Sequence, residues 1–165
     1  METRKPNRLA YYDYSQNGAY FVTICTKDKA KILWDKYPLP FVGEAISLPQ
    51  YTSHLSKYGK LVYDAVNNTP HYYPGVLVDK FVVMPNHVHI ILVITGNDGR
   101  MISAPTISTI IGQAKRIVSK QIGKPVWQKS FHDHIIRSDA EHLETWQYID
   151  SNPLTWESDC FYTEN

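Results

Sequence analysis

The sequence lacks the features of secreted and membrane proteins. It has only two cysteines in 165 residues, Cys25 and Cys160, and they show no paired spacing of a disulfide or metal site. No apolar run reaches the about 18 residues of a membrane span, because Phe81–Ile94 is interrupted by Pro85 and Asn86. The first fifteen residues have no apolar core of a secretory signal. These absences predict a cytoplasmic protein without a membrane partner.

A large net charge is also absent. The formal net charge is +1, so the overall charge does not indicate a nucleic-acid-binding protein. The charges are nevertheless unevenly distributed, and a local basic surface could follow phosphates or could simply be a solvated helix face. The basic residues cluster as Arg4, Lys5 and Arg8, and as Lys115, Arg116, Lys120, Lys124 and Lys129, whereas the segment from Asp139 onward is acidic and contains no Lys or Arg. Twelve tyrosines and four tryptophans offer stacking surfaces for unpaired bases, although they fill cores equally well.

The length and the residue pattern predict one α+β domain over residues 1–165, with a basic, Tyr-rich arm at residues 1–19. Stretches rich in β-branched and aromatic residues predict strands at Tyr20–Thr26, Val76–Met84, His87–Ile94 and around His134–Arg137. Helical spacing predicts helices at Ser53–Asn67, with Thr52 or Ser53 as cap, at Thr106–Ile122, and from Ser138 to the stop at Pro153. Residues 32–48 could hold an irregular hairpin. This order of elements predicts an antiparallel β-sheet with helices packed on it.

Two histidines stand at the start of the most apolar predicted strand. Residues two apart in a strand share a face, so His87 and His89 should project together. The strand is apolar on both faces and should therefore lie centrally in the sheet. Two imidazoles placed in this way could form half of a metal site or an acid–base pair, or they could merely end a core strand.

The last predicted helix carries a tyrosine followed one turn later by an asparagine. At about 100° per residue, the core face should hold Ala140, Leu143, Trp146 and Ile149. Tyr148 then lies on the opposite half, with Asn152 as its neighbour. These two residues could be a presented nucleophile beside a metal ligand, or a surface tyrosine beside a C-capping amide.

Four segments match one known family, in the same order and over nearly the whole chain. They are Arg8-Leu9 with Tyr12–Ser15 and Gly18–Thr23, then Met84–His89, then Val126–Gln128 with Phe131–Arg137, and finally Tyr148–Pro153. Together they resemble the single-tyrosine HUH transposases, and most closely the REP-associated tyrosine transposases. Each segment alone is modest evidence, but the combination is specific.

The resemblance implies a ferredoxin-like, HUH nuclease-like sandwich that cuts and rejoins single-stranded DNA at hairpins formed by palindromic repeats. It implies Tyr148 as the nucleophile that forms a 5′-phosphotyrosine intermediate, and His87, His89 and Asn152 as ligands of Mg²⁺ or Mn²⁺. Either a monomer or a homodimer would be compatible with it. The basic residues that we expect to contact the DNA are Arg4, Lys5, Arg8, Lys115, Arg116 and Lys120.

Three alternatives compete with this interpretation. A histidine-triad nucleotide hydrolase would need a third histidine where the chain has Ile91. A structural zinc site could use the two histidines with Cys25 or Cys160, but no compact zinc spacing exists. A non-catalytic hairpin-binding protein derived from a transposase is the alternative that fits best, although both halves of the predicted site are intact.

Overall fold

A four-stranded antiparallel sheet forms the centre of the molecule. The computed structural model describes residues 11–35, 52–95 and 105–164. The sheet has the order β2-β3-β1-β4, and every neighbouring pair is antiparallel. Its strands are β1 (Gly18–Cys25), β2 (Val76–Val83), β3 (His87–Ile94) and β4 (His132–Ile136). The four predicted strands are therefore confirmed, with small differences at their ends.

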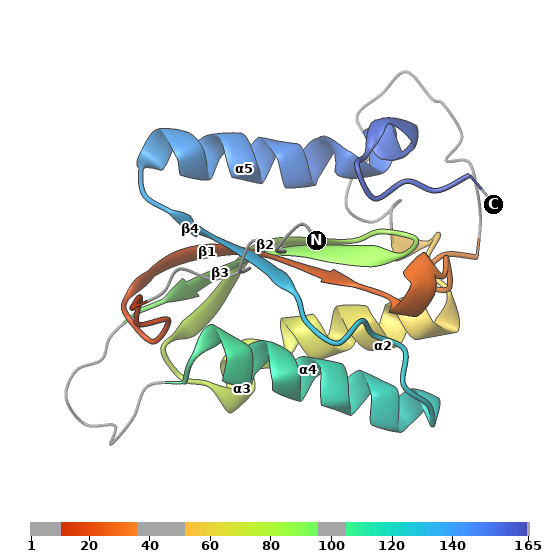
Figure 1. The fold of residues 1–165 in the computed structure, drawn as a ribbon, viewed down its shortest axis with the longest axis horizontal. Coiled ribbons are helices and arrows are strands. Elements are labelled where there is room, and N and C mark those ends of the chain that lie inside the picture. Colours follow the sequence, from red (N-terminus) through yellow and green to blue (C-terminus); the bar gives the residue numbers. More distant parts are fainter. Residues whose placement is uncertain (1–10, 36–51, 96–104, 165) are drawn as a thin grey trace, which may run out of the picture.

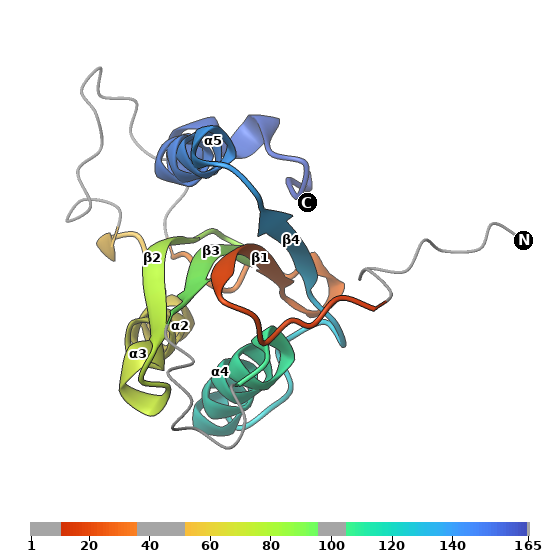
Figure 2. The ribbon, with the colours of Figure 1, turned by 90° about the vertical axis from the view of Figure 1, so that its left-hand side faces the viewer.

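Helices cover both faces of this sheet, which confirms the predicted α+β class (Figure 1). One face packs against α2 (Lys57–Asn67), α3 (Thr69–Tyr72) and α4 (Ile107–Ile122). The opposite face is covered by α5 (Asp139–Ser151), as the turned view in Figure 2 also shows. Two short 3₁₀ helices, η1 (Lys27–Lys29) and η2 (Asn152–Ser158), complete the described elements. No helix in these ranges is both long and apolar enough to cross a bilayer.

β3 is an interior strand, as its apolar composition predicted. Seven of its eight residues are buried, including His87 and His89. The tight turn before it is closed by the Met84 N–H, which donates to the His87 carbonyl oxygen at 2.8 Å. Because β3 cannot slip without exposing a whole apolar face, its register fixes where the two histidines lie.

The start of α2 was predicted too early. Leu55 forms an isolated antiparallel bridge with Trp34, so the chain is extended there and cannot yet be helical. The cap is Ser56, whose side chain accepts from the N–H groups of Tyr58 and Gly59. α4, by contrast, ends at Ile122 as predicted, and it begins one residue later than predicted, at Ile107 after the Thr106 cap.

The predicted core face of α5 is wrong. Of its four expected core residues, only Ile149 is buried, whereas Leu143 is 58% exposed and Trp146 is 37% exposed. The Ser138 cap is confirmed, since its hydroxyl accepts from the Glu141 N–H. Of the other expected features, residues 1–10 of the N-terminal arm and most of the hairpin in residues 32–48 lie outside the described residues.

Two helical glycines make a matched test of the packing. A Cβ on Gly59 would lie 2.1 Å from the Leu33 carbonyl oxygen, whereas a Cβ on Gly112 would meet nothing within 4 Å. Gly59→Ala should therefore lower the free energy of unfolding by about 2–3 kcal/mol through overpacking. Gly112→Ala should raise it by about 0.5–1 kcal/mol, because alanine is the better helix former. Chemical denaturation measures both, and a neutral Gly59→Ala would contradict the packing of α2 on the Ile32–Trp34 segment.

Candidate active site and metal centre

The two histidines of β3 face each other within the protein. Their Nε2 atoms lie 3.0 Å apart, and both side chains are buried. The sheet register places Cys25 and Thr23 of β1 opposite His87 and His89. The predicted pairing of the two imidazoles on one strand face is thus confirmed.

Asn86 determines which nitrogen of His87 carries the proton. The Asn86 amide nitrogen donates to the carbonyl oxygens of Phe161, at 3.0 Å, and Lys29, at 3.4 Å. Its Oδ1 atom therefore faces His87 Nδ1, at 2.8 Å, and can only accept. Nδ1 must be the donor, so the lone pair of His87 Nε2 points toward His89.

The contact with Thr23 allows either tautomer of His89, whereas the contact with Asn86 allows only one tautomer of His87. The Thr23 hydroxyl lies 2.8 Å from His89 Nδ1, and a hydroxyl can either donate or accept. When Thr23 donates, His89 Nε2 carries the hydrogen and can donate it to His87. When Thr23 accepts, both Nε2 lone pairs are free to face a cation. The pair can therefore exchange a hydrogen bond for metal coordination without moving the rings.

Burial keeps both imidazoles neutral. It lowers the pKa of His87 to about 3, with the neighbouring His89 adding to the effect. Burial also lowers the pKa of His89, against the opposing influence of Asp159. Neutral imidazole is the form that binds metal ions, so the pair is ready for a ligand role at neutral pH.

Tyr148 reaches this pair from α5. Its hydroxyl lies 3.3 Å from His89 Nε2 and donates to Asp159 Oδ2 at 3.1 Å. The ring meets those of His89 and Phe21, at centroid distances of 5.2 and 6.2 Å. Burial, and then the Asp159 carboxylate, raise the pKa of the Tyr148 phenol above its ordinary value. The residue is still 39% exposed, so its phenol borders both the buried pair and the surface.

Asn152 lies directly after α5 and is almost completely buried. Its amide nitrogen donates to Asp159 Oδ2 at 2.6 Å. Its Oδ1 atom is buried and has no hydrogen-bond partner. A buried acceptor without a partner is costly, and a bound cation beside it would remove that cost.

Asp159 belongs to the site, and sequence reasoning missed it. Its side chain is fully buried, and Oδ2 lies 3.9 Å from His87 Nε2 and 3.8 Å from His89 Nε2. Burial alone would raise its pKa, but His89, Asn152 and the Phe161 N–H outweigh burial and lower it. Asp159 is therefore an anion at neutral pH. The sequence offered only a weak signal, the acidic composition of the C-terminal stretch.

The last residues of the chain hold Asp159 in place. The Phe161 N–H donates to Asp159 Oδ1 at 2.7 Å, and the Phe161 ring packs on those of His87 and His89, at 4.7 and 5.7 Å. The Asn86 amide, which orients His87, also binds the Phe161 carbonyl. One set of contacts thus fixes both a histidine and the segment that carries the carboxylate.

Comparisons with known proteins show what the whole chain is similar to. No family model matches the chain. It is 30% identical to an uncharacterised protein of Haemophilus influenzae, over 98% of this chain and 94% of that protein. It is 24% identical to a second Haemophilus influenzae protein, provisionally assigned as a REP-associated tyrosine transposase, over 86% of this chain and 73% of that protein.

The fold is also similar to that of a solved protein with the same name. A solved REP-associated tyrosine transposase, bound to a REP hairpin, superposes with a TM-score of 0.61 at 21% identity, covering 90% of this chain and 74% of that one. The resemblance to REP-associated tyrosine transposases that the sequence suggested is confirmed.

The buried cluster fits a divalent cation. His87, His89 and Asp159 each offer a ligand atom, and these atoms lie within 4.8 Å of one another. The 3.0 Å between the two Nε2 atoms is the separation expected for two ligands side by side on one octahedral cation with bonds of about 2.1 Å. Asn152 Oδ1 adds an acceptor without a partner. Within the described residues, His87, His89 and Asp159 are the group of at least three potential metal ligands that lie close together. The group contains no cysteine, which argues against the structural zinc alternative.

The predicted DNA-binding residues are not gathered at the site. Arg4, Lys5 and Arg8 lie outside the described residues. Lys115 donates to the carbonyl oxygens of Gln128 and Ser130, and so secures the segment before β4. Arg116 and Lys120 lie on α4, across the sheet from Tyr148 (Figures 1 and 2). Their role in DNA binding stays a prediction.

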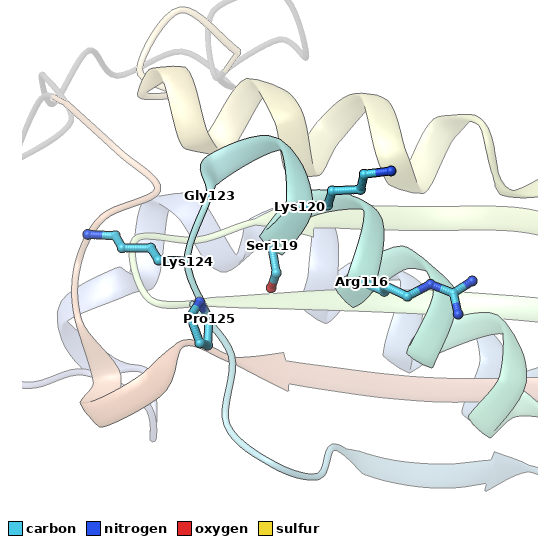
Figure 3. A pocket seen from close by; sticks show the side chains of 6 residues that line it. All are labelled: Arg116, Ser119, Lys120, Gly123, Lys124 and Pro125. Carbon is cyan, nitrogen blue, oxygen red and sulfur yellow. The ribbon is translucent and has the colours of Figure 1, made fainter.

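A shallow pocket at the end of α4 collects some of this basic charge. It is lined by Arg116, Ser119, Lys120, Gly123, Lys124 and Pro125. In Figure 3 the charged ends of Arg116 and Lys124 point in opposite directions. The pocket is therefore a basic surface that could follow a phosphate backbone, and it has no converging donors for a single anion.

Proposed function

We propose that this chain cuts and rejoins single-stranded DNA at hairpin-forming sequences, with Tyr148 as the nucleophile. One observation carries the proposal: the phenol of Tyr148 lies 3.3 Å from His89 Nε2, at the edge of a buried cluster suited to a metal ion. A nucleophile next to metal ligands is the arrangement required for attack on a phosphate that the same ion holds. The similarity to REP-associated tyrosine transposases, and the hairpin bound by the solved one, support the choice of substrate.

The proposed reaction is a balanced exchange of phosphodiester bonds. A bond forms between Tyr148 Oη and the phosphorus, and the bond between the phosphorus and the 3′ oxygen breaks. The proton of the phenol ends on the departing 3′ oxygen. The bond energy is retained in the 5′-phosphotyrosine, so a 3′-hydroxyl can reverse the step and rejoin DNA without a co-reactant.

The protein contributes ligands, orientation and a dry environment. His87, His89 and Asn152 would hold Mg²⁺ or Mn²⁺, which would polarise the scissile phosphate and stabilise charge on the departing oxygen. Asn86 and Thr23 keep the imidazole Nε2 atoms directed at the ion. The rings of Trp156 and Phe161 cover the inner side of His87. Tyr148 is 39% exposed, so its phenol contacts the buried histidine and can also be reached from solvent.

We expect DNA with a hairpin and a single-stranded flank to bind more tightly than a perfect duplex of the same sequence. The chain is nearly neutral overall and rich in aromatic residues, which suits stacking on unpaired bases better than reading a duplex groove. Fluorescence anisotropy at one fixed salt concentration measures both affinities. Equal affinity for the two forms would contradict this recognition mode.

A covalent product is the decisive test of the reaction. The protein is incubated with a fluorescent hairpin strand and Mn²⁺, and the mixture is separated on a denaturing gel. A labelled band at the mass of protein plus DNA is the expected result. A protein that binds the hairpin but gives neither that band nor cleaved DNA would instead be a non-catalytic hairpin-binding protein.

A further inference from the structure

The complete burial of the Asp159 carboxylate is not explained by its hydrogen bonds alone. The Asp159 carboxylate is buried completely, and its Oδ2 atom lies within 4 Å of His87 Nε2 and His89 Nε2. Three hydrogen bonds serve it, from Asn152, Tyr148 and the Phe161 N–H. No lysine or arginine within the described residues forms an ion pair with it, and an uncompensated buried charge is unfavourable.

The ligands expected from the family pattern carry no charge. His87, His89 and Asn152 together offer neutral nitrogen and oxygen atoms. Mg²⁺ and Mn²⁺ prefer oxygen ligands, and anionic carboxylates above all. The described cluster contains one such group, on a segment eleven residues beyond the proposed nucleophile.

We infer that Asp159 is the anionic ligand of this metal site, binding the cation through Oδ2 together with His87 and His89. The inference rests on the metal site of the proposed function and assigns it a residue outside the two predicted motifs. It also accounts for the buried charge, because a divalent cation compensates it.

The existing hydrogen bonds indicate what changes when the cation binds. Oδ2 already accepts from Asn152 at 2.6 Å and from the Tyr148 hydroxyl at 3.1 Å. A cation needs one of these positions, and the longer bond to Tyr148 is the one that yields. Coordination by Asp159 therefore also releases the Tyr148 hydroxyl from its acceptor.

Asp159→Asn tests the inference through metal binding in the absence of DNA. The substitution keeps the side-chain shape and removes the charge. Glu157→Gln is the matched control, because it removes the same charge from an exposed side chain two residues earlier. The signal of free Mn²⁺ in electron paramagnetic resonance measures the affinity of each protein. We expect Asp159→Asn to weaken Mn²⁺ binding about tenfold or more and Glu157→Gln to change it less than about twofold. Wild-type affinity in Asp159→Asn would overturn the inference.

A change of ligand type distinguishes coordination from indirect support. An Asp159→Cys variant should bind Cd²⁺ through the new thiolate and produce a sulfur-to-metal charge-transfer absorption. The natural Cys160 lies beside it and is exposed, so both proteins compared should carry Cys160→Ser. The absorption should occur with Asp159→Cys in that background and not without it. Its absence would mean that residue 159 supports the site without touching the metal.

The outcomes also separate this inference from the proposed function. Mn²⁺ binding that depends on Asp159, in a protein that never cleaves DNA, would leave the ligand assignment standing and contradict the nuclease. If the wild-type protein cleaves hairpins but Asp159→Asn binds Mn²⁺ with unchanged affinity, the nuclease function would stand and the ligand assignment would be contradicted. Circular dichroism of each variant establishes that the comparison is made between folded proteins.

Discussion

Replacing Tyr148 by phenylalanine should eliminate the covalent protein–DNA product while the fold and the affinity for hairpin DNA remain. The change removes one oxygen and keeps the ring that packs on Phe21 and His89. The lost hydrogen bonds should cost the folded state about 1 kcal/mol or less, because the residue is partly exposed. The loss of adduct should be at least about 100-fold, since no other group can take the place of a covalent nucleophile. Denaturing gels measure the adduct, and anisotropy measures the binding.

Other tyrosines provide the control for this experiment. Tyr72 is 52% exposed and lies on α3, on the other side of the sheet from α5. Tyr72→Phe should therefore form the adduct at the wild-type rate. Tryptic digestion of the wild-type adduct and mass analysis of the DNA-linked peptide identify the attached residue directly. A linked peptide that lacks Tyr148, for instance one containing Tyr12 or Tyr14, would refute the assignment even if the family function held.

The sheet and the histidine pair were predictable because they follow from short-range periodicity. Alternation along β3 places His87 and His89 on one face, and its two-sided apolar pattern requires a central position. Tyr148 and Asn152 were predictable as neighbours for a similar reason, since they stand one helical turn apart. The juxtaposition of these two pairs came from the family resemblance, because periodicity says nothing about which elements meet in space.

The core face of α5 could not be predicted in this way. A helical wheel assigns the large apolar residues to the inside, which would bury Leu143 and Trp146. In the structure the inner side of α5 covers polar groups, so Tyr148 and Asn152 face the sheet and Leu143 faces outward. The rule failed because this helix serves a site, and a site needs polar residues at buried positions.

Asp159 was unpredictable for a different reason. After Pro153 the chain leaves the α-helix, turns through η2 and returns to the histidines. No helical or strand spacing relates Asp159 to Tyr148, so only three-dimensional structure brings them together. Asn86 was likewise not predicted to be part of the site, although its side chain orients His87 and binds the Phe161 carbonyl oxygen.

Alanine at His87 or at His89 should abolish cleavage and also abolish the stabilisation of the protein by Mn²⁺. Both side chains serve one cation, so each loss is expected to be nearly complete and the double variant no worse than either single one. Wild-type Tm should rise with Mn²⁺ concentration, because a ligand that binds the folded state stabilises it. Neither single variant should show this rise. Differential scanning fluorimetry and the cleavage assay measure the two effects independently.

Asn152→Ala separates a weaker ligand from an essential one. The change removes a neutral acceptor and leaves His87, His89 and Asp159, so activity should fall at low Mn²⁺ and recover in part at high Mn²⁺. The histidine variants should not recover, because half of the nitrogen ligands are lost. Hairpin affinity should persist in all of them, since recognition of the hairpin should not depend on these metal ligands. Undiminished cleavage by the wild-type protein in EDTA would contradict metal participation, and a double histidine variant much less active than both singles would contradict a shared ion.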